Sequence, residues 1–167
     1  TVISGPTNIK IGNEIKLIKV ETADQMFNEI QKNLPVDVAI FSAAVGDFKV
    51  VKKSSVKIKK RDELTIKLEK NVDILNYVSN HNSMRPKLVI GFAAETNNLE
   101  DNAIEKLKNK NCDMIIANDV SNQNIGFDSD FNEVTIFYKN SKKEKLFAKK
   151  KSLIAEEIVE KVNSQLS

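Results

Sequence analysis

Residues 38–60 read VAIFSAAVGDFKVVKKSSVKIKK, and this stretch says more about the fold than any other part of the chain. Val38–Phe41 is a short apolar run, which is typical of a buried parallel strand. Small residues follow it, and then a single acid, Asp47. Ligands of open α/β sheets bind beyond the carboxyl ends of such strands. The stretch therefore predicts an α/β sheet with a ligand site around Asp47.

The second half of this stretch is strongly basic. Seven basic side chains precede the next acid, Asp62; they are Lys49, Lys52, Lys53, Lys57, Lys59, Lys60 and Arg61. Phosphate oxygens are the natural complement of such a cluster. A solvated basic loop, or a sheet edge protected by lysine, explains the same composition. The composition by itself leaves both interpretations open.

Helical and strand patterns alternate along the rest of the chain. Thr22 and Gln25 have the spacing of a capping box, which predicts a helix from Ala23 to about Lys32. Apolar runs predict further strands at residues 2–4, 15–20, 88–92 and 114–117, and helical spacing predicts helices at residues 73–81, 99–110 and 153–162. Residues 63–69 alternate apolar and polar side chains, which predicts a half-exposed strand.

The end of the chain has a different pattern. Residues 119–132 form a polar loop that contains Gly126 and Phe127, and residues 134–137 and 145–147 are typical of a β-hairpin. Alternating strands and helices predict a Rossmann-like α/β fold, with a mainly parallel sheet, helices on both faces and an antiparallel hairpin addition. A length of 167 residues favours one domain, residues 1–167.

Composition excludes several classes of protein. Hydrophobic residues make up 41% and charged residues 29%, and no apolar run approaches the ~20 residues of a membrane span, so we expect a soluble protein. Cys112 is the only cysteine, which fits the reducing cytoplasm, and His81 is the only histidine. Both are expected to lack a catalytic role. A net charge of +3 is too small to indicate a nucleic-acid binder.

Glycine usage narrows the possible nucleotide sites. The five glycines cannot form GxGxxG or GxxxxGK[ST], which disfavours a standard dinucleotide oxidoreductase and a Walker-type site. A bound nucleotide would have its phosphates held by helix N-termini and lysines. Lys57, Lys106 and Lys110 are the candidates.

Several segments, in order and spacing, resemble one family. They are Ser42-Ala43-Ala44-Val45-Gly46-Asp47, Lys57-Ile58-Lys59-Lys60, Asn71-Val72-Asp73-Ile74, Gly91-Phe92-Ala93-Ala94-Glu95-Thr96-Asn97, Ala117-Asn118-Asp119-Val120 and Gly126-Phe127-Asp128-Ser129-Asp130. The chain resembles phosphopantothenoylcysteine synthetase, the C-terminal domain of the bacterial bifunctional coenzyme A biosynthesis flavoprotein. The resemblance covers nearly all of the chain.

This resemblance implies a CTP-dependent, cytoplasmic ligase that joins 4′-phosphopantothenate and cysteine through an acyl-cytidylate. It implies Mg²⁺ accompanying CTP, no flavin in this domain and a decarboxylase flavoprotein domain fused to it or paired with it. It also implies a homodimer, expected to form through residues 57–69 and the hairpin at residues 133–147. No nucleic-acid or membrane partner is expected.

The resemblance assigns roles to particular residues. Lys57, on a mobile flap, would be catalytic and would stabilise charge in the transition state. Asp47 would contact CTP or its magnesium, and the sequence does not decide which, so the metal ligands stay unknown. The other residues assigned to the CTP site are Phe41, Ser42, Ala43, Val72, Asp73, Ile74, Leu75, Phe92, Lys106 and Lys110.

The chain departs from the family pattern in three places. Gly46 stands where the family more often has alanine, and Val72 where it usually has proline. The family's first strand, turn and helix are expected before Thr1, so we expect this sequence to lack that segment and to be inactive alone. The alternative from another class is a non-catalytic nucleotide- or RNA-binding module that uses the basic residues 49–61.

Overall fold

The computed structural model describes residues 1–9, 11–52, 54, 56–59, 63–121 and 129–166. The chain divides into two compact units. Unit 1 comprises Thr1–Asn33 and Ala43–Ile74, and unit 2 comprises Leu34–Ser42 and Leu75–Ser167.

Unit 2 contains a five-stranded sheet in the order β3-β6-β7-β8-β9. The parallel strands are β3 (Val38–Phe41), β6 (Leu88–Glu95) and β7 (Met114–Asp119). The antiparallel strands are β8 (Phe131–Tyr138) and β9 (Lys143–Lys150). This is the predicted parallel sheet with its antiparallel hairpin, although the hairpin strands are longer than the sequence pattern indicated.

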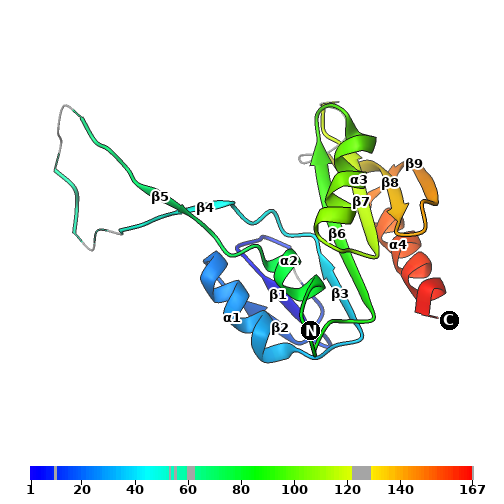
Figure 1. Ribbon diagram of the computed structural model, residues 1–167, viewed down its shortest axis with the longest axis horizontal. Coiled ribbons are helices and arrows are strands. Elements are labelled where there is room, and N and C mark those ends of the chain that lie inside the picture. The colour runs from blue at the N-terminus through cyan, green and yellow to red at the C-terminus, as the bar shows by residue number, and fades with distance from the viewer. Residues whose placement is uncertain (10, 53, 55, 60–62, 122–128, 167) are drawn as a thin grey trace. The chain divides into compact units, whose positions relative to one another are not determined.

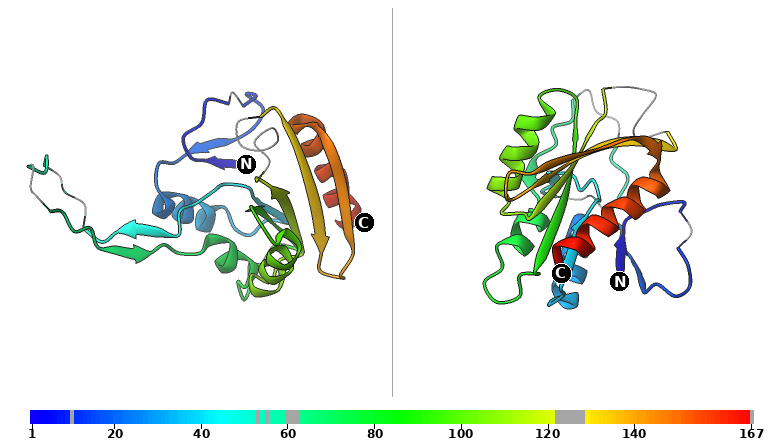
Figure 2. Two further views of the ribbon diagram at one scale, coloured as in Figure 1. Left: turned by 90° about the horizontal axis from the view of Figure 1, so that it is seen from above. Right: turned by 90° about the vertical axis from the view of Figure 1, so that its right-hand side faces the viewer.

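The helices α3 (Leu99–Asn109) and α4 (Lys151–Leu166) cover opposite faces of this sheet, as Figure 2 shows in green and red. Ile90 and Ile116 pack in the cluster that contains Ile158 of α4, whereas Val89 and Ile115 pack in the cluster that contains Leu107 of α3. Successive strand residues thus serve opposite faces. No helix that the structure describes is long and apolar enough to cross a membrane.

Unit 1 contains two small sheets and one long helix. β1 (Val2–Ser4) pairs in parallel with β2 (Leu17–Lys19), and β4 (Phe48–Val50) pairs antiparallel with β5 (Leu68–Lys70), side by side in Figure 1. The capping box of α1 (Ala23–Asn33) is confirmed. The Gln25 amide donates to Thr22 Oγ1 at 3.2 Å, and the Thr22 amide donates to Gln25 Oε1 at 3.1 Å.

Three expectations need correction. Val38–Phe41 is a parallel strand but not a buried one, because β3 forms an edge of the five-stranded sheet and Ile40 is 46% exposed. Among the residues that the structure describes, the alternation over residues 63–69 gives a ladder only at Leu68–Lys70, and Leu64 and Ile66 are exposed. The loop assigned to residues 119–132 ends earlier, since β8 begins at Phe131; Gly126 and Phe127 lie outside the described residues.

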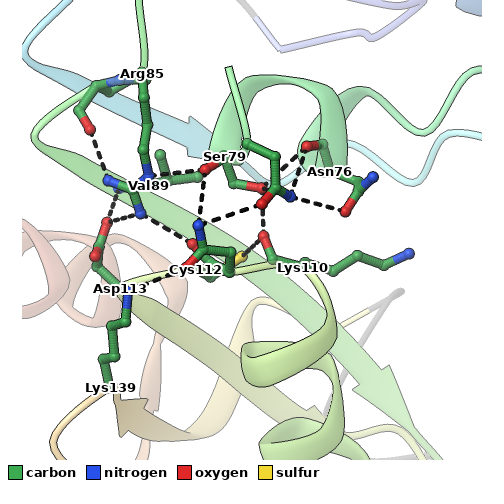
Figure 3. Close-up of polar contacts among 11 residues, drawn as sticks. Asn76, Ser79, Arg85, Val89, Lys110, Cys112, Asp113 and Lys139 are labelled. Atoms are coloured by element: carbon green, nitrogen blue, oxygen red, sulfur yellow. Dashed lines mark hydrogen bonds and ion pairs between the residues drawn. The ribbon is translucent and has the colours of Figure 1, made fainter. Parts of the chain in front are cut away.

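A polar cluster around Arg85 joins three segments of unit 2 (Figure 3). The Arg85 guanidinium donates to the carbonyl oxygens of Ser79, Pro86 and Asn111 at 2.8–2.9 Å and to Asp113 Oδ2 at 3.0 Å. The same Asp113 oxygen accepts the Val89 amide at 2.8 Å. The cluster therefore ties the end of α2 (Ile74–Ser79) to the starts of β6 and β7.

A smaller ionic cluster attaches α4 to the hairpin. Glu144 on β9 accepts from Lys142 Nζ at 2.6 Å and from Lys161 Nζ of α4 at 2.7 Å. These hydrogen bonds lower the pKa of Glu144 from 4.5 to about 2, and the bond from Lys142 has the larger effect. Since the folded-state pKa lies below the unfolded one, this stabilisation is fully present above about pH 4.5 and is lost as the pH falls toward 2.

We expect Glu144→Gln to lower the free energy of unfolding by about 1 kcal/mol at neutral pH, because solvent screens a pair of this exposure. The difference from wild type should shrink as the pH falls from 4.5 toward 2. Urea unfolding followed by circular dichroism measures both, and the absence of tryptophan makes that probe the natural choice. A difference independent of pH would contradict the ionic explanation.

Candidate functional site

The carboxyl ends of the parallel strands of unit 2 carry the first part of the candidate site. Ser42 follows β3 directly and is exposed. Glu95 and Asp119 end β6 and β7 and are opposite each other in the register of the two strands. Glu95 Oε2 accepts from Asn102 Nδ2 at 2.8 Å, and the hydroxyl and amide of Ser121 lower the pKa of Asp119 by donating to it.

Gly91 explains how α2 packs on the sheet. A Cβ atom at this position would lie 2.8 Å from Ile115 Cδ1 and 2.9 Å from Leu75 Cδ2, so a larger residue would displace the helix or the strand. Leu75 and Phe41 are half-buried against the cluster that α3 covers. The structure thus brings these two predicted site residues into the same core, where their side chains support the sheet edge.

Phe92 and Lys106 come together in a way that the sequence did not indicate. The Phe92 side chain packs on the α4 face of the sheet. Its carbonyl oxygen accepts from Nζ of Lys106, which reaches it from α3 over a distance of 2.8 Å. A primary ammonium group held at the main chain in this way can still donate its two other protons. Lys106 is therefore oriented by the backbone of the Gly91–Asn97 segment.

Lys110 lies one residue beyond the end of α3. Its amide donates to the Lys106 carbonyl at 2.9 Å, and its own carbonyl accepts from the Ser79 hydroxyl. The backbone of Lys110 thus belongs to the polar region around Arg85 (Figure 3), at the opposite end of α3 from Glu95 and Asn102. Lys106 thus contacts the Phe92 main chain, whereas Lys110 belongs to the region around Arg85, although the sequence analysis assigned both lysines to the same CTP site.

Unit 1 holds a separate group of predicted site residues, in two adjoining segments. The loop at residues 43–47 contains Ala43 and Asp47, and residues 72–74 run from the loop after β5 into the first residue of α2. Asn71 joins the two segments, because its amide donates to the Asp47 carbonyl at 2.8 Å and its Nδ2 donates to the Gly46 carbonyl at 2.6 Å. Asp47, Val72 and Asp73 are exposed, whereas Ile74 is buried.

The basic segment is less uniform than its composition suggests. Lys49 pairs with Asp24 of α1 at 2.9 Å and lies 3.8 Å from Glu69. The hydrogen bond to Asp24, followed by its charge, raises the pKa of Lys49. Lys57 is exposed and makes no ion pair with another described residue. Lys49 therefore stabilises unit 1 through its ion pair, whereas Lys57 is available to bind a ligand.

The predicted site residues thus fall into three local groups. Ala43, Asp47, Val72, Asp73 and Ile74 are brought together in unit 1, Phe41 with Leu75 share one core of unit 2, and Phe92 is joined to Lys106. Ser42 follows Phe41 directly in the chain, and Lys57 and Lys110 lie apart from the others within their own units.

The sequence reasoning missed two residues that organise these groups. Asn71 was quoted as part of a motif but given no role, and Glu95 was treated in the same way. An asparagine directly after a strand and before a helix is a signal for a side-chain-to-backbone hydrogen bond. The strands at residues 88–92 and 114–117 run parallel, and extending their pairing toward the carboxyl ends would have placed Glu95 opposite Asp119.

Comparison with known proteins gives consistent matches over the whole chain. The family model described as the DNA/pantothenate metabolism flavoprotein C-terminal domain matches residues 1–166. The coenzyme A biosynthesis bifunctional protein CoaBC of Haemophilus influenzae is 40% identical over 164 residues, which are 97% of this chain and 40% of that protein. CoaBC of Borreliella burgdorferi is 42% identical over 163 residues, 95% of this chain and 40% of that protein.

A solved structure supports the same match. The crystal structure of the C-terminal domain of CoaBC superposes with a TM-score of 0.77 at 34% sequence identity, covering 98% of this chain and 72% of that one. The chain spans about 40% of the length of these curated relatives. The similarity therefore concerns one part of those proteins.

Proposed function

Because the chain belongs to the DNA/pantothenate metabolism flavoprotein C-terminal domain family, we propose that it is the phosphopantothenate–cysteine ligase part of a coenzyme A biosynthesis protein. The observation that carries the proposal is the 40% identity to CoaBC along 97% of the chain. The local geometry supports it: exposed polar groups lie on loops held by hydrogen bonds, next to the lysine-rich segment. A flavoprotein decarboxylase domain is the expected companion, fused or paired.

The proposed reaction has two steps. A carboxylate oxygen of 4′-phosphopantothenate attacks the α-phosphorus of CTP, the bond between the α-phosphorus and the bridging oxygen breaks, and pyrophosphate leaves. The amine of cysteine then attacks the acyl carbon, an amide forms, CMP leaves and the amine loses a proton. Positioning and charge stabilisation are the main tasks that this chemistry sets for a protein.

Unit 1 supplies the groups for the triphosphate in this proposal. Lys57 offers a cation that no described acid neutralises, so it can close on the phosphates and stabilise charge that develops there. Ala43, Val72 and Asp73 line the nucleotide site in this proposal, and Ile74, whose side chain is buried, borders it through its main chain.

Magnesium fits the same part of the site. The Asp47 carboxylate is exposed, and a single hard oxygen ligand together with nucleotide phosphates is the usual way in which proteins hold this ion. The ion would supply charge neutralisation on the phosphates. Asp47 would hold it from the loop that Asn71 fixes.

The remaining residues that the resemblance assigns to CTP belong to unit 2. Ser42 follows β3 directly, and Phe41, Leu75 and Phe92 pack in the two cores of this unit. Lys106, whose Nζ donates to the Phe92 carbonyl, and Lys110 are the lysines of this unit that are proposed to meet phosphate oxygens.

The test is a coupled pyrophosphate-release assay on the intact gene product with 4′-phosphopantothenate, cysteine and Mg²⁺. We expect pyrophosphate release with CTP, amide formation only when cysteine is present, and at least tenfold lower kcat/KM with ATP, a difference of about 1.4 kcal/mol. Omitting 4′-phosphopantothenate is the control for simple hydrolysis. No release with any nucleotide, together with tight RNA binding, would favour the nucleic-acid-binding alternative instead.

The β4–β5 ribbon supports the further proposal of a homodimer. Phe48, Val50 and Leu68 share one face of the ribbon, which also carries the exposed Lys70 at its end, and Phe48 and Leu68 are more than half exposed. The opposite face carries Lys49 and Glu69 and turns its charges toward Asp24. An apolar face directed outward needs a partner. Phe147 on β9, 69% exposed, gives the hairpin a similar feature.

We expect the intact gene product to sediment as a dimer at tens of micromolar. Phe48→Glu combined with Leu68→Glu should shift it to monomer, because two charges then stand on the apolar face. Lys52→Gln and Lys59→Gln, which lower the net charge of the same segment by the same total amount, serve as the control. A wild-type protein that is monomeric at this concentration would contradict the proposal.

A further inference from the structure

We infer that Asn71 is a positioning residue that sets the distance between the two nucleotide-binding segments of unit 1. The inference rests on the proposed function, because it concerns the same nucleotide site. Asn71 follows β5 directly and precedes Val72–Ile74, so it belongs to one segment and is bonded to the other. Both bonds end on main-chain carbonyl oxygens, so neither of them occupies the side chain of a residue assigned to CTP.

The two bonds of Asn71 continue the β4–β5 ladder into the loops. The last pair of that ladder joins Phe48 to Lys70. Beyond it, the Asn71 amide donates to the Asp47 carbonyl at 2.8 Å, and Nδ2 donates to the Gly46 carbonyl at 2.6 Å. The side chain thus adds a bond one residue farther along than the backbone ladder reaches. It holds Asp47 and its loop at a set distance from the start of α2.

The oxygen atom of the Asn71 carboxamide has no role in this bonding, which leaves the nitrogen as the functional atom. Asn71 Oδ1 is buried and has no hydrogen-bond partner among the described residues. A buried acceptor without a partner costs about 1–3 kcal/mol, so stability alone gives no reason for an amide here. The donor at Nδ2 is the feature that a smaller or apolar residue cannot supply. Asn71 therefore lowers the stability of the fold somewhat and, in return, fixes the position of the loop at residues 43–47.

Displacement of such a loop has a predictable effect on binding. Asp47 and Ala43 lie on one side of the Asn71 bond, and Val72 and Asp73 on the other. A nucleotide that contacts both segments is bound well only when their spacing is right, and a shift of about 1 Å is enough to weaken several contacts together. Loss of the bond should therefore raise KM for CTP, while the charge supplied by Lys57 and hence kcat stay nearly unchanged.

The decisive variant is Asn71→Asp, which keeps the shape of the side chain and replaces the donor with an acceptor. At pH 8 the carboxylate faces the Gly46 carbonyl, and we expect CTP to bind about tenfold more weakly, or about 1.4 kcal/mol.

Asn71→Ala is the second variant. It removes the donor without adding a charge, so it should weaken CTP binding about as much as Asn71→Asp does, and circular dichroism shows whether each variant is folded.

Asn82→Asp, an exposed asparagine in the turn after α2, is the matched control and should bind CTP as wild type does. If wild type binds CTP and folded Asn71→Asp binds it equally well at pH 8, the inference is overturned. A loss in kcat at unchanged KM would overturn it as well. If wild type does not bind CTP at all, the proposed function itself fails, which is a different result.

Discussion

Lys57→Gln should lower kcat by about 100-fold, a loss of about 2.7 kcal/mol of transition-state stabilisation. Lys57 is exposed on the segment between β4 and β5, and no described acid neutralises it. In the proposed reaction, negative charge moves onto the leaving pyrophosphate. A cation that meets this charge mainly in the transition state contributes more to kcat than to CTP binding. KM for CTP should accordingly stay within about threefold of wild type.

Lys59→Gln provides the matched control, because Lys59 is also exposed and lies two residues away. It should change kcat by less than about threefold. The measurement is steady-state pyrophosphate release on the intact gene product, combined with calorimetric titration of CTP. A Lys57→Gln enzyme that keeps more than a third of the wild-type turnover would show that Lys57 is an ordinary surface lysine.

Arg85→Ala should be the most destabilising single substitution considered, with a loss of about 3 kcal/mol in the free energy of unfolding. The guanidinium satisfies three carbonyl oxygens and the Asp113 carboxylate. Its side chain is only 25% exposed and that of Asp113 only 18%. Removing the arginine leaves these acceptors with poor access to water, and unpaired buried groups cost more than the bonds themselves contribute.

Two companion variants separate the causes. Arg85→Lys keeps the charge but cannot reproduce the planar fork, so it should recover only part of the loss. Lys87→Ala removes a lysine whose ion pair with Asp37 is 75% and 74% exposed, and it should leave the free energy of unfolding nearly unchanged because solvent screens the pair. Urea unfolding by circular dichroism gives all three values. Equal effects of Arg85→Ala and Lys87→Ala would contradict the structural argument.

Local chemistry explains which parts of the fold could be predicted. The capping box of Thr22 and Gln25 involves residues close in sequence, and its two hydrogen bonds are the ones expected. The strands at residues 88–92 and 114–117 could be predicted because both of their faces are buried, which gives each strand a continuous apolar run. The alternation at residues 63–69 predicted a longer strand than the described residues form, since the pairing with β4 that the structure describes begins at Leu68.

The candidate site was less predictable because much of it depends on main-chain groups. Lys106 is held by the carbonyl of Phe92, and Asn71 by those of Gly46 and Asp47. Every residue has a carbonyl, so no residue type indicates which one a lysine or an asparagine will reach. The resemblance to a family supplied the residues, and the structure supplies the bonds that position them.

The division of the chain has a consequence for synthesis on the ribosome. Unit 2 takes β3 from residues 34–42 and its remaining elements from residues 75–167, with a segment of unit 1 between them. β3 pairs with β6, which begins 47 residues after Phe41. At about 5–20 residues per second, the nascent β3 waits roughly 2–10 s for this partner. Force measurements on stalled nascent chains should therefore show no folding of the sheet before β6 has left the exit tunnel, and during that interval Ile40 and Val38 are apolar sites for a chaperone.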